Sequence, residues 1–171
     1  MTVVVFGTYD ERQHPRVAVI IEALLDRGHR VIRCNEPFGV STSERISAAR
    51  HPWQAALLVF RLMSCWWRLV KAARGVGRDT PDAVLVGYLG VLDVHLARLC
   101  FSAPVILDNM APVAGTANDR SLPFAKLFSA IDRLATSAAA ITIWDTAEQM
   151  SAGGTTRNGI VVPVGAPAKW F

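Results

Sequence analysis

The chain has 171 residues, which is the length of one domain and is long enough to bury a sizeable core. Apolar residues make up 51% of the chain and charged residues 19%, so the composition excludes a disordered protein. The net charge of +4 favours anionic partners, and three widely spaced cysteines argue against a disulfide framework or a zinc site.

A βαβ unit is predicted at the start of the chain. Residues 2–6 form a β-branched run that ends at Gly7, which is typical of a strand buried on both faces of a parallel sheet. Pro15 begins a helix at a position that proline tolerates, and Gly28 ends it. Residues 30–34 give a second strand and complete a unit of about 30 residues.

The rest of the chain continues to alternate strands with helices. We expect strands over 83–86, 104–107, 140–143 and 160–162, and helices over 53–74, 93–101, 123–137 and 146–152. Residues 36–52 and 109–121 read as loops. Asp145 is predicted to cap the last helix, with Glu148 as its capping-box partner. This alternation predicts an α/β, doubly wound, mostly parallel sheet of the Rossmann-like type.

The loop after the first strand carries the first candidate binding residues. These are Gly7, Thr8, Tyr9, Arg12, His14 and Arg16. Gly7 would let a ligand approach the backbone, the next helix N-terminus would suit an anion, and Arg12 and Arg16 would add positive charge. A tight turn with solvated charges explains the same residues. The dinucleotide fingerprint G-x-G-x-x-G does not follow this strand.

Later strands bring further candidates to the same edge, because ligands bind at the carboxyl ends of the strands in such sheets. The third strand leads to Gly87 and Tyr88, and Asp93 follows at the next helix start, where it either caps the helix or binds a sugar hydroxyl. Asp108 ends the fourth strand and either faces the crevice or stabilises a loop. No catalytic triad or P-loop can be assembled by spacing, so the sequence assigns no catalytic residues.

The segment from Arg45 to Arg78 concentrates the positive charge. It contains no Asp or Glu and carries +7, against +4 for the whole chain, so the basicity is local. The helix over 53–74 has a polar stripe of Arg61, Ser64, Arg68 and Lys71. Apolar side chains, Trp66 and Trp67 among them, cover more of the remaining surface than one contact with a sheet needs.

Two interpretations of this helix are open. In the first, it packs on the sheet, and another domain or partner covers part of its outer face. In the second, it lies in the interface of an anionic membrane, with tryptophans at the headgroups and cations toward the lipid. The candidates for that surface are Arg61, Trp66, Trp67, Arg68 and Lys71. Arg61 and Arg68 argue against a helix that spans the bilayer.

The sequence also predicts a location. Its N-terminus reads as a strand and has neither the basic region nor the cleavage site of a signal peptide, and no run of about 18 uncharged apolar residues occurs. We therefore expect a cytoplasmic protein with Cys34, Cys65 and Cys100 reduced, peripheral on the inner face of the membrane under the second interpretation. No nucleic-acid partner is predicted.

Five segments occur in order over nearly the whole chain. They are Val4 to Asp10 with Pro15 and Arg16, Val84 to Gly90 with Asp93, Val105 to Asp108, Ile143 to Thr146 with Glu148, and Val161 to Ala166 with Phe171. Together they resemble the N-terminal domain of family-four-type glycosyltransferases with the GT-B fold. The family often pairs glycines after the first strand, where Gly7 stands alone here.

The resemblance implies two facing Rossmann-like domains with the active site between them. Residues 1–171 would be the domain that holds a sugar or lipid-linked acceptor. The C-terminal partner domain, which in that family holds the nucleotide sugar and carries an acidic E-x7-E motif, would be missing from this chain. Transfer would retain the anomeric configuration without a metal. This chain would bind no cofactor and would be inactive alone.

Two other hypotheses come from different classes. The first is a non-catalytic binding module that docks on a membrane or a partner through the basic, tryptophan-rich helix. The second is another doubly wound protein, such as a nucleotide-dependent epimerase or reductase, and the missing glycine fingerprint counts against it.

Overall fold

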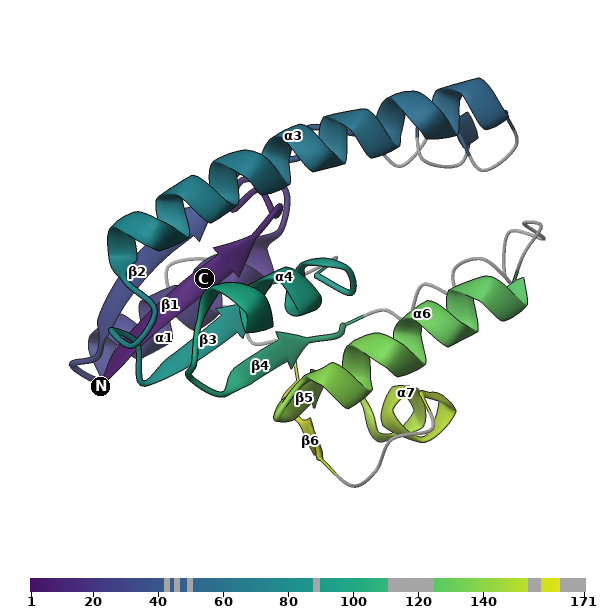
Figure 1. Ribbon diagram of the computed structural model, residues 1–171. Helices are drawn as coiled ribbons and strands as arrows, with labels where there is room; N and C mark the ends of the chain where they lie inside the picture. The colour runs from purple at the N-terminus through teal and green to yellow at the C-terminus, as the bar shows by residue number, and fades with distance from the viewer. Residues whose placement is uncertain are drawn as a thin grey trace.

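The computed structural model describes residues 1–41, 44, 47–48, 51–87, 90–110, 125–153 and 158–163. Within these residues, six parallel strands form one sheet in the order β2-β1-β3-β4-β5-β6 (Figure 1). The strands are β1 (Thr2–Gly7), β2 (Arg30–Asn35), β3 (Ala83–Val86), β4 (Val105–Asp108), β5 (Ile141–Trp144) and β6 (Gly159–Val161). Every predicted strand is confirmed to within one residue at each end.

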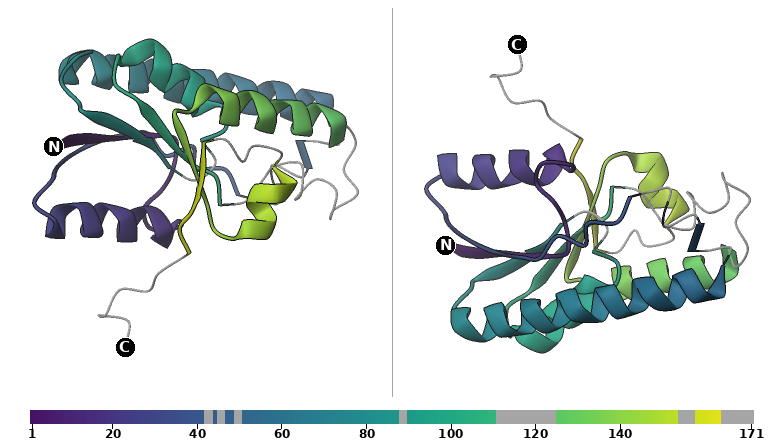
Figure 2. Two further views of the ribbon diagram at one scale, coloured as in Figure 1. Left: turned by 90° about the horizontal axis from the view of Figure 1, so that it is seen from below. Right: turned by 90° about the horizontal axis from the view of Figure 1, so that it is seen from above.

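Helices cover both faces of this sheet. They are α1 (Pro15–Asp26), α3 (Pro52–Val76), α4 (Asp93–Cys100), α6 (Ala125–Ala138) and α7 (Ala147–Ala152). Figure 2 shows α1 on one face and α3, α4 and α6 on the other, while α7 lies next to β5 and β6. The layers confirm the predicted doubly wound α/β fold.

The core has two halves because successive side chains of a strand point to opposite faces. Val4 and Phe6 of β1 pack toward α3 and α4, where the Phe6 ring meets that of Phe101 edge to face with centroids 5.8 Å apart. Val3 and Val5 pack toward α1 on the other face. β1 is therefore buried on both sides, as its continuous apolar sequence predicts.

The strand order reverses between β1 and β3. The chain leaves β1 through α1 to reach β2 on one side, and it returns through α3 to place β3 on the other. The register pairs Phe6 with Val86, so Gly7 and Gly87 follow at neighbouring strand ends. Ligands of open α/β sheets bind at such a point, which makes this edge the first place to look for a site.

The cap of α7 differs from the prediction. Thr146, not Asp145, is the N-cap residue, and its hydroxyl accepts a hydrogen bond from the Gln149 backbone N–H at 3.2 Å. Glu148 is thus the second helical residue, so the predicted capping box is wrong. The Asp145 carboxylate instead lies 3.5 Å from the Arg16 guanidinium, an attraction between distant residues that the local pattern does not reveal.

The helix α3 is the longest described element, with 25 residues. Its N-terminal half and that of α6 extend past the carboxyl ends of the strands (Figures 1 and 2). Over the part of the chain that the structure describes, no helix combines the length and the apolar character needed to cross a bilayer.

Candidate functional site at the carboxyl edge of the sheet

Two glycines at the switch point are in close contact with protein atoms. Gly7 has φ of 140°, a backbone conformation that favours glycine, and a Cβ there would lie 3.0 Å from an Asp93 carboxylate oxygen. A Cβ on Gly87 would lie 2.9 Å from the Tyr9 ring and 3.1 Å from a Val17 methyl group. Close packing of the chain on itself therefore accounts for both glycines without a ligand.

Gly87→Ala should destabilise the fold. The added methyl group meets the buried Tyr9 ring and Val17, which cannot move aside cheaply, so we expect a loss of about 1–3 kcal/mol in the free energy of unfolding. Urea denaturation followed by circular dichroism measures it. Gly75→Ala in α3 is the matched control, because nothing lies within 4 Å of its Cβ and alanine favours a helix. Equal stability of the two variants would contradict this packing account.

A buried carboxylate joins three elements at this edge. Asp93, the first residue of α4, accepts hydrogen bonds at Oδ2 from the Thr8 backbone N–H at 2.7 Å and from the Thr8 hydroxyl at 2.8 Å. Its Oδ1 accepts from the Trp66 indole N–H at 2.7 Å. Asp93 therefore ties the end of β1 to α3 and α4. Burial raises the pKa of this carboxyl, and the hydrogen bonds from Thr8 and Trp66 oppose that rise.

These contacts correct two expectations. Asp93 does not cap α4, because the N-cap residue is Leu92, although a carboxylate in the first turn still suits the helix dipole. Trp66 is not an outer-surface residue: it is half-buried, packs against the core and donates to Asp93. Helical spacing places Trp66 beside Leu62 and Val70, but it places Trp67 beside Ser64 and Lys71 of the polar stripe. This spacing was an available signal that separates half-buried Trp66 from exposed Trp67.

A buried ion pair organises the other end of the edge. The Arg16 Nε lies 2.8 and 3.0 Å from the two Asp108 carboxylate oxygens, and the side chains are only 6% and 0% exposed. The Arg16 Nη1 lies 3.5 Å from Asp145, and Nη2 donates to the Val162 backbone oxygen at 3.0 Å. One arginine from α1 thus joins the ends of β4 and β5 and the residue that follows β6.

Arg16 therefore differs from the exposed cation that we expected for an anionic ligand. Its charge is balanced by Asp108 and Asp145, and its guanidinium is turned toward the protein interior. Asp108 likewise binds Arg16 and is hidden from solvent. Burial raises the pKa of the Asp108 carboxyl, while Arg16 opposes that rise.

Tyr9 lies in the core and not in an open crevice. Its ring packs with Val17 and Ile21 on the α1 face, and burial raises the pKa of its hydroxyl well above the ordinary value. Within the described ranges, its hydroxyl has no hydrogen-bond partner. A water or a ligand hydroxyl could satisfy such an atom.

Sequence reasoning missed other buried polar groups without a partner in the described part of the chain. They are Asn109 Nδ2, Trp144 Nε1 and Gln149 Oε1. Asn109 follows β4 and Trp144 ends β5, so both lie at the carboxyl edge of the sheet. The positions of Asn109 and Trp144 at strand ends were the signal that the sequence offered. Ligands bind at the carboxyl ends of the strands in such sheets, so a polar side chain at a strand end is a candidate for ligand binding.

Two of the predicted residues remain accessible in the loop after β1. Arg12 is exposed, and its backbone N–H donates to the Asp10 carboxylate at 2.9 Å. His14 is half-buried, with Nδ1 3.0 Å from the Asp10 backbone oxygen. The predicted site residue Tyr88 lies outside the described residues. This loop offers guanidinium and imidazole groups, which suit the binding of a polar ligand.

Comparison with models of known protein families and with curated proteins finds no match to this chain. In the described ranges, no group of three His, Cys, Asp or Glu side chains is placed to hold a metal ion. The edge thus combines hydrogen-bonding groups, two internally bound carboxylates and a loop that carries Arg12 and His14 together with Asp10 and Glu11.

Proposed function

We propose that the chain is the acceptor-side, N-terminal domain of a two-domain GT-B glycosyltransferase. With a donor-binding domain, it would transfer a sugar from a nucleotide sugar to a sugar or lipid-linked acceptor, with retention and without a metal. The nucleotide sugar would bind to the partner domain, and this chain would supply one wall of the cleft.

One observation carries the proposal. Each segment of the resemblance contains the carboxyl end of a strand, and these ends share one edge of the sheet. The residues at or directly after them are Gly7, Gly87, Asp108, Asp145 and Val162. The last three are held together by Arg16, so segments far apart in the sequence lie side by side at this edge. This placement supports the proposal because the resemblance implies an acceptor wall there, although the fold alone is compatible with other activities.

The test is binding without turnover. The isolated chain should bind candidate sugar acceptors weakly in ligand-observed NMR and should transfer no radiolabelled sugar from nucleotide sugars. Arg12→Ala with His14→Ala should weaken acceptor binding by about tenfold, the effect of roughly 1.4 kcal/mol of lost contacts. Arg27→Ala is the matched control, an exposed arginine just after α1.

Three results would contradict the proposal. Robust sugar transfer by the isolated chain would show that it does not need a donor domain. Tight binding of a dinucleotide in calorimetry would favour an epimerase or a reductase. Absence of binding to every acceptor, with the fold intact, would remove the acceptor role.

A further inference from the structure

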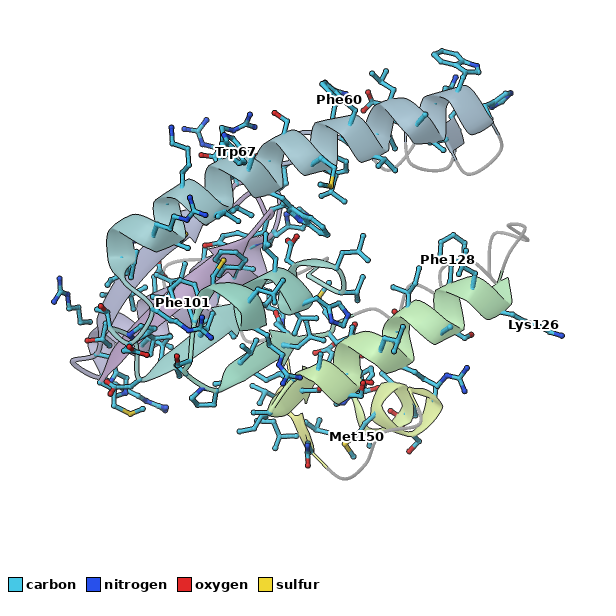
Figure 3. All side chains as sticks on the ribbon, in the orientation of Figure 1. Phe60, Trp67, Phe101, Lys126, Phe128 and Met150 are labelled. Atoms are coloured by element: carbon cyan, nitrogen blue, oxygen red, sulfur yellow. The ribbon has the colours of Figure 1, made fainter. Side chains whose placement is uncertain are left out.

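The outer face of α3 exposes a seam of large apolar side chains. Trp53, Phe60 and Trp67 are 67%, 73% and 66% exposed, and Leu57 and Met63 are exposed beside them. Figure 3 shows Phe60 and Trp67 on the side of α3 that points away from the sheet, whereas Phe101 lies within the fold. Single exposed apolar residues are normal, but this run spans about 21 Å of one helix face, which marks an interaction surface.

Positive charge accompanies the seam. The helix contains Arg61, Arg68, Lys71 and Arg74, and no acidic residue occurs between Pro52 and Val76. Residues 53, 57, 60, 64, 67, 71 and 74 alternate steps of four and three, so Lys71 and Arg74 continue the line of Trp53, Leu57, Phe60 and Trp67. The face is therefore apolar over its first turns and cationic over its last.

A hollow of about 300 Å³ opens beside Phe60 and has both characters. Phe38 and Phe60 give it apolar walls, and Arg61 and Arg68 line it as well. Arg68 Nε lies 2.9 Å from Glu36, and Arg61 lies 4.0 Å from Glu44. A ligand phosphate would compete with these two carboxylates, so exposed Lys71 and Arg74 are the better test of charge.

We propose that the outer face of α3 is a docking surface for an anionic lipid bilayer. The helix would lie in the plane of the interface, with Phe60 and Trp67 among the headgroups and upper acyl chains and the cations against lipid phosphates. Charge decides against a second copy of the chain. Its α3 would bring another set of cations and no acidic residue, and the nearby Glu36 and Glu44 already pair with Arg68 and Arg61.

Docking on α3 would also place the candidate site near the membrane. Trp66, next to Trp67, donates to Asp93, and Asp93 accepts from Thr8 at the end of β1. The N-terminal half of α3 extends past the carboxyl ends of the strands (Figure 2). The inference does not require the glycosyltransferase proposal, since vesicle binding is measured without sugar or acceptor.

The experiment is cosedimentation with vesicles of phosphatidylcholine alone or mixed with phosphatidylglycerol. The wild-type chain should bind the mixed vesicles at low salt at least about tenfold more tightly than the neutral ones. Binding to the mixed vesicles should weaken toward 1 M salt, where the Debye length falls to about 3 Å.

Three variants assign the binding to this face. Phe60→Ser with Trp67→Ser should weaken binding to the mixed vesicles by at least about tenfold, because the apolar anchors are lost. Lys71→Glu with Arg74→Glu should remove the preference for phosphatidylglycerol. Leu25→Ser is the matched control, because Leu25 is also exposed but lies on α1, on the opposite face of the sheet. Far-ultraviolet circular dichroism should show that all three keep the wild-type fold.

Several outcomes would overturn the proposal. These are no binding of the wild-type chain at low salt, equal binding to both kinds of vesicle, or unchanged binding of the Phe60 and Trp67 variant. Sedimentation velocity measures the oligomeric state and so tests whether a second copy of the chain binds this face. A dimer that the Phe60 and Trp67 changes dissociate, without vesicle binding, would assign the face to a second copy.

Discussion

Replacing Arg16 with methionine is expected to lower the free energy of unfolding by about 3–5 kcal/mol, the cost of breaking a buried ion pair from one side. The change leaves the Asp108 carboxylate inside the protein without its cation, and the Val162 backbone oxygen loses a donor. Asp145 is less affected because its side chain is 27% exposed and water can solvate it. Urea denaturation followed by circular dichroism measures the loss.

A second variant separates the ion pair from simple packing. Arg16→Met with Asp108→Leu removes both charges and keeps the space filled, so we expect it to be more stable than Arg16→Met alone. Arg12→Met is the matched control four residues away. Arg12 is exposed, and its replacement should change stability by no more than about 0.5 kcal/mol. If Arg16→Met were as stable as Arg12→Met, the buried pair would not organise this edge.

The elements of this fold could be predicted because their signals are local. Residues 2–6 read as a buried strand, Pro15 and Gly28 mark the ends of a helix region, and each later strand lies within one residue of its predicted place. The parallel sheet then follows from alternation and handedness. The predicted N-cap residue of α7 was wrong by one position. Asp145 and Thr146 are both good N-cap residues, and the distant Arg16 attracts the Asp145 carboxylate.

The sequence predicted where the candidate site lies but not which side chains contact one another there. The topology brings Gly7, Gly87 and Asp108 to one edge of the sheet, and the alternation of strands and helices in the sequence predicts this placement. It does not show that Arg16 meets Asp108 across 92 positions or that Trp66 meets Asp93 across 27. Such pairs depend on how helices sit on the sheet. The sequence can therefore place a charged residue at this edge of the sheet. It cannot tell whether the charged side chain binds a ligand or another side chain of the protein.

Replacing Asp93 with alanine is the second change with a large expected effect. The Thr8 backbone N–H, the Thr8 hydroxyl and the Trp66 indole N–H all lose their acceptor. An unsatisfied buried donor costs about 1–3 kcal/mol, so we expect a total loss of about 3 kcal/mol, with water partly replacing the acceptor for half-buried Trp66. Trp66→Phe, which removes one donor only, should cost less.

Asp93 also predicts how stability depends on pH. Burial raises the pKa of its carboxyl in the folded chain, while the unfolded chain keeps an ordinary value of about 3.9. The folded state therefore binds the Asp93 proton more tightly than the unfolded state does. The resulting contribution of Asp93 to the free energy of unfolding is fully present below about pH 3.9 and is lost as the pH rises through the folded pKa. Asp108 acts in the same direction.

The difference between the wild-type chain and Asp93→Asn isolates this contribution. An amide carries no titrating proton, so the variant should lose less stability than the wild-type chain as the pH rises from about 4. At every pH it should still lack an acceptor for one donor, because an amide nitrogen cannot accept from the Trp66 indole. Urea denaturation at a series of pH values measures both effects. Parallel curves for the two proteins would mean that Asp93 does not titrate differently in the folded chain, and its burial between β1, α3 and α4 would not explain its pKa.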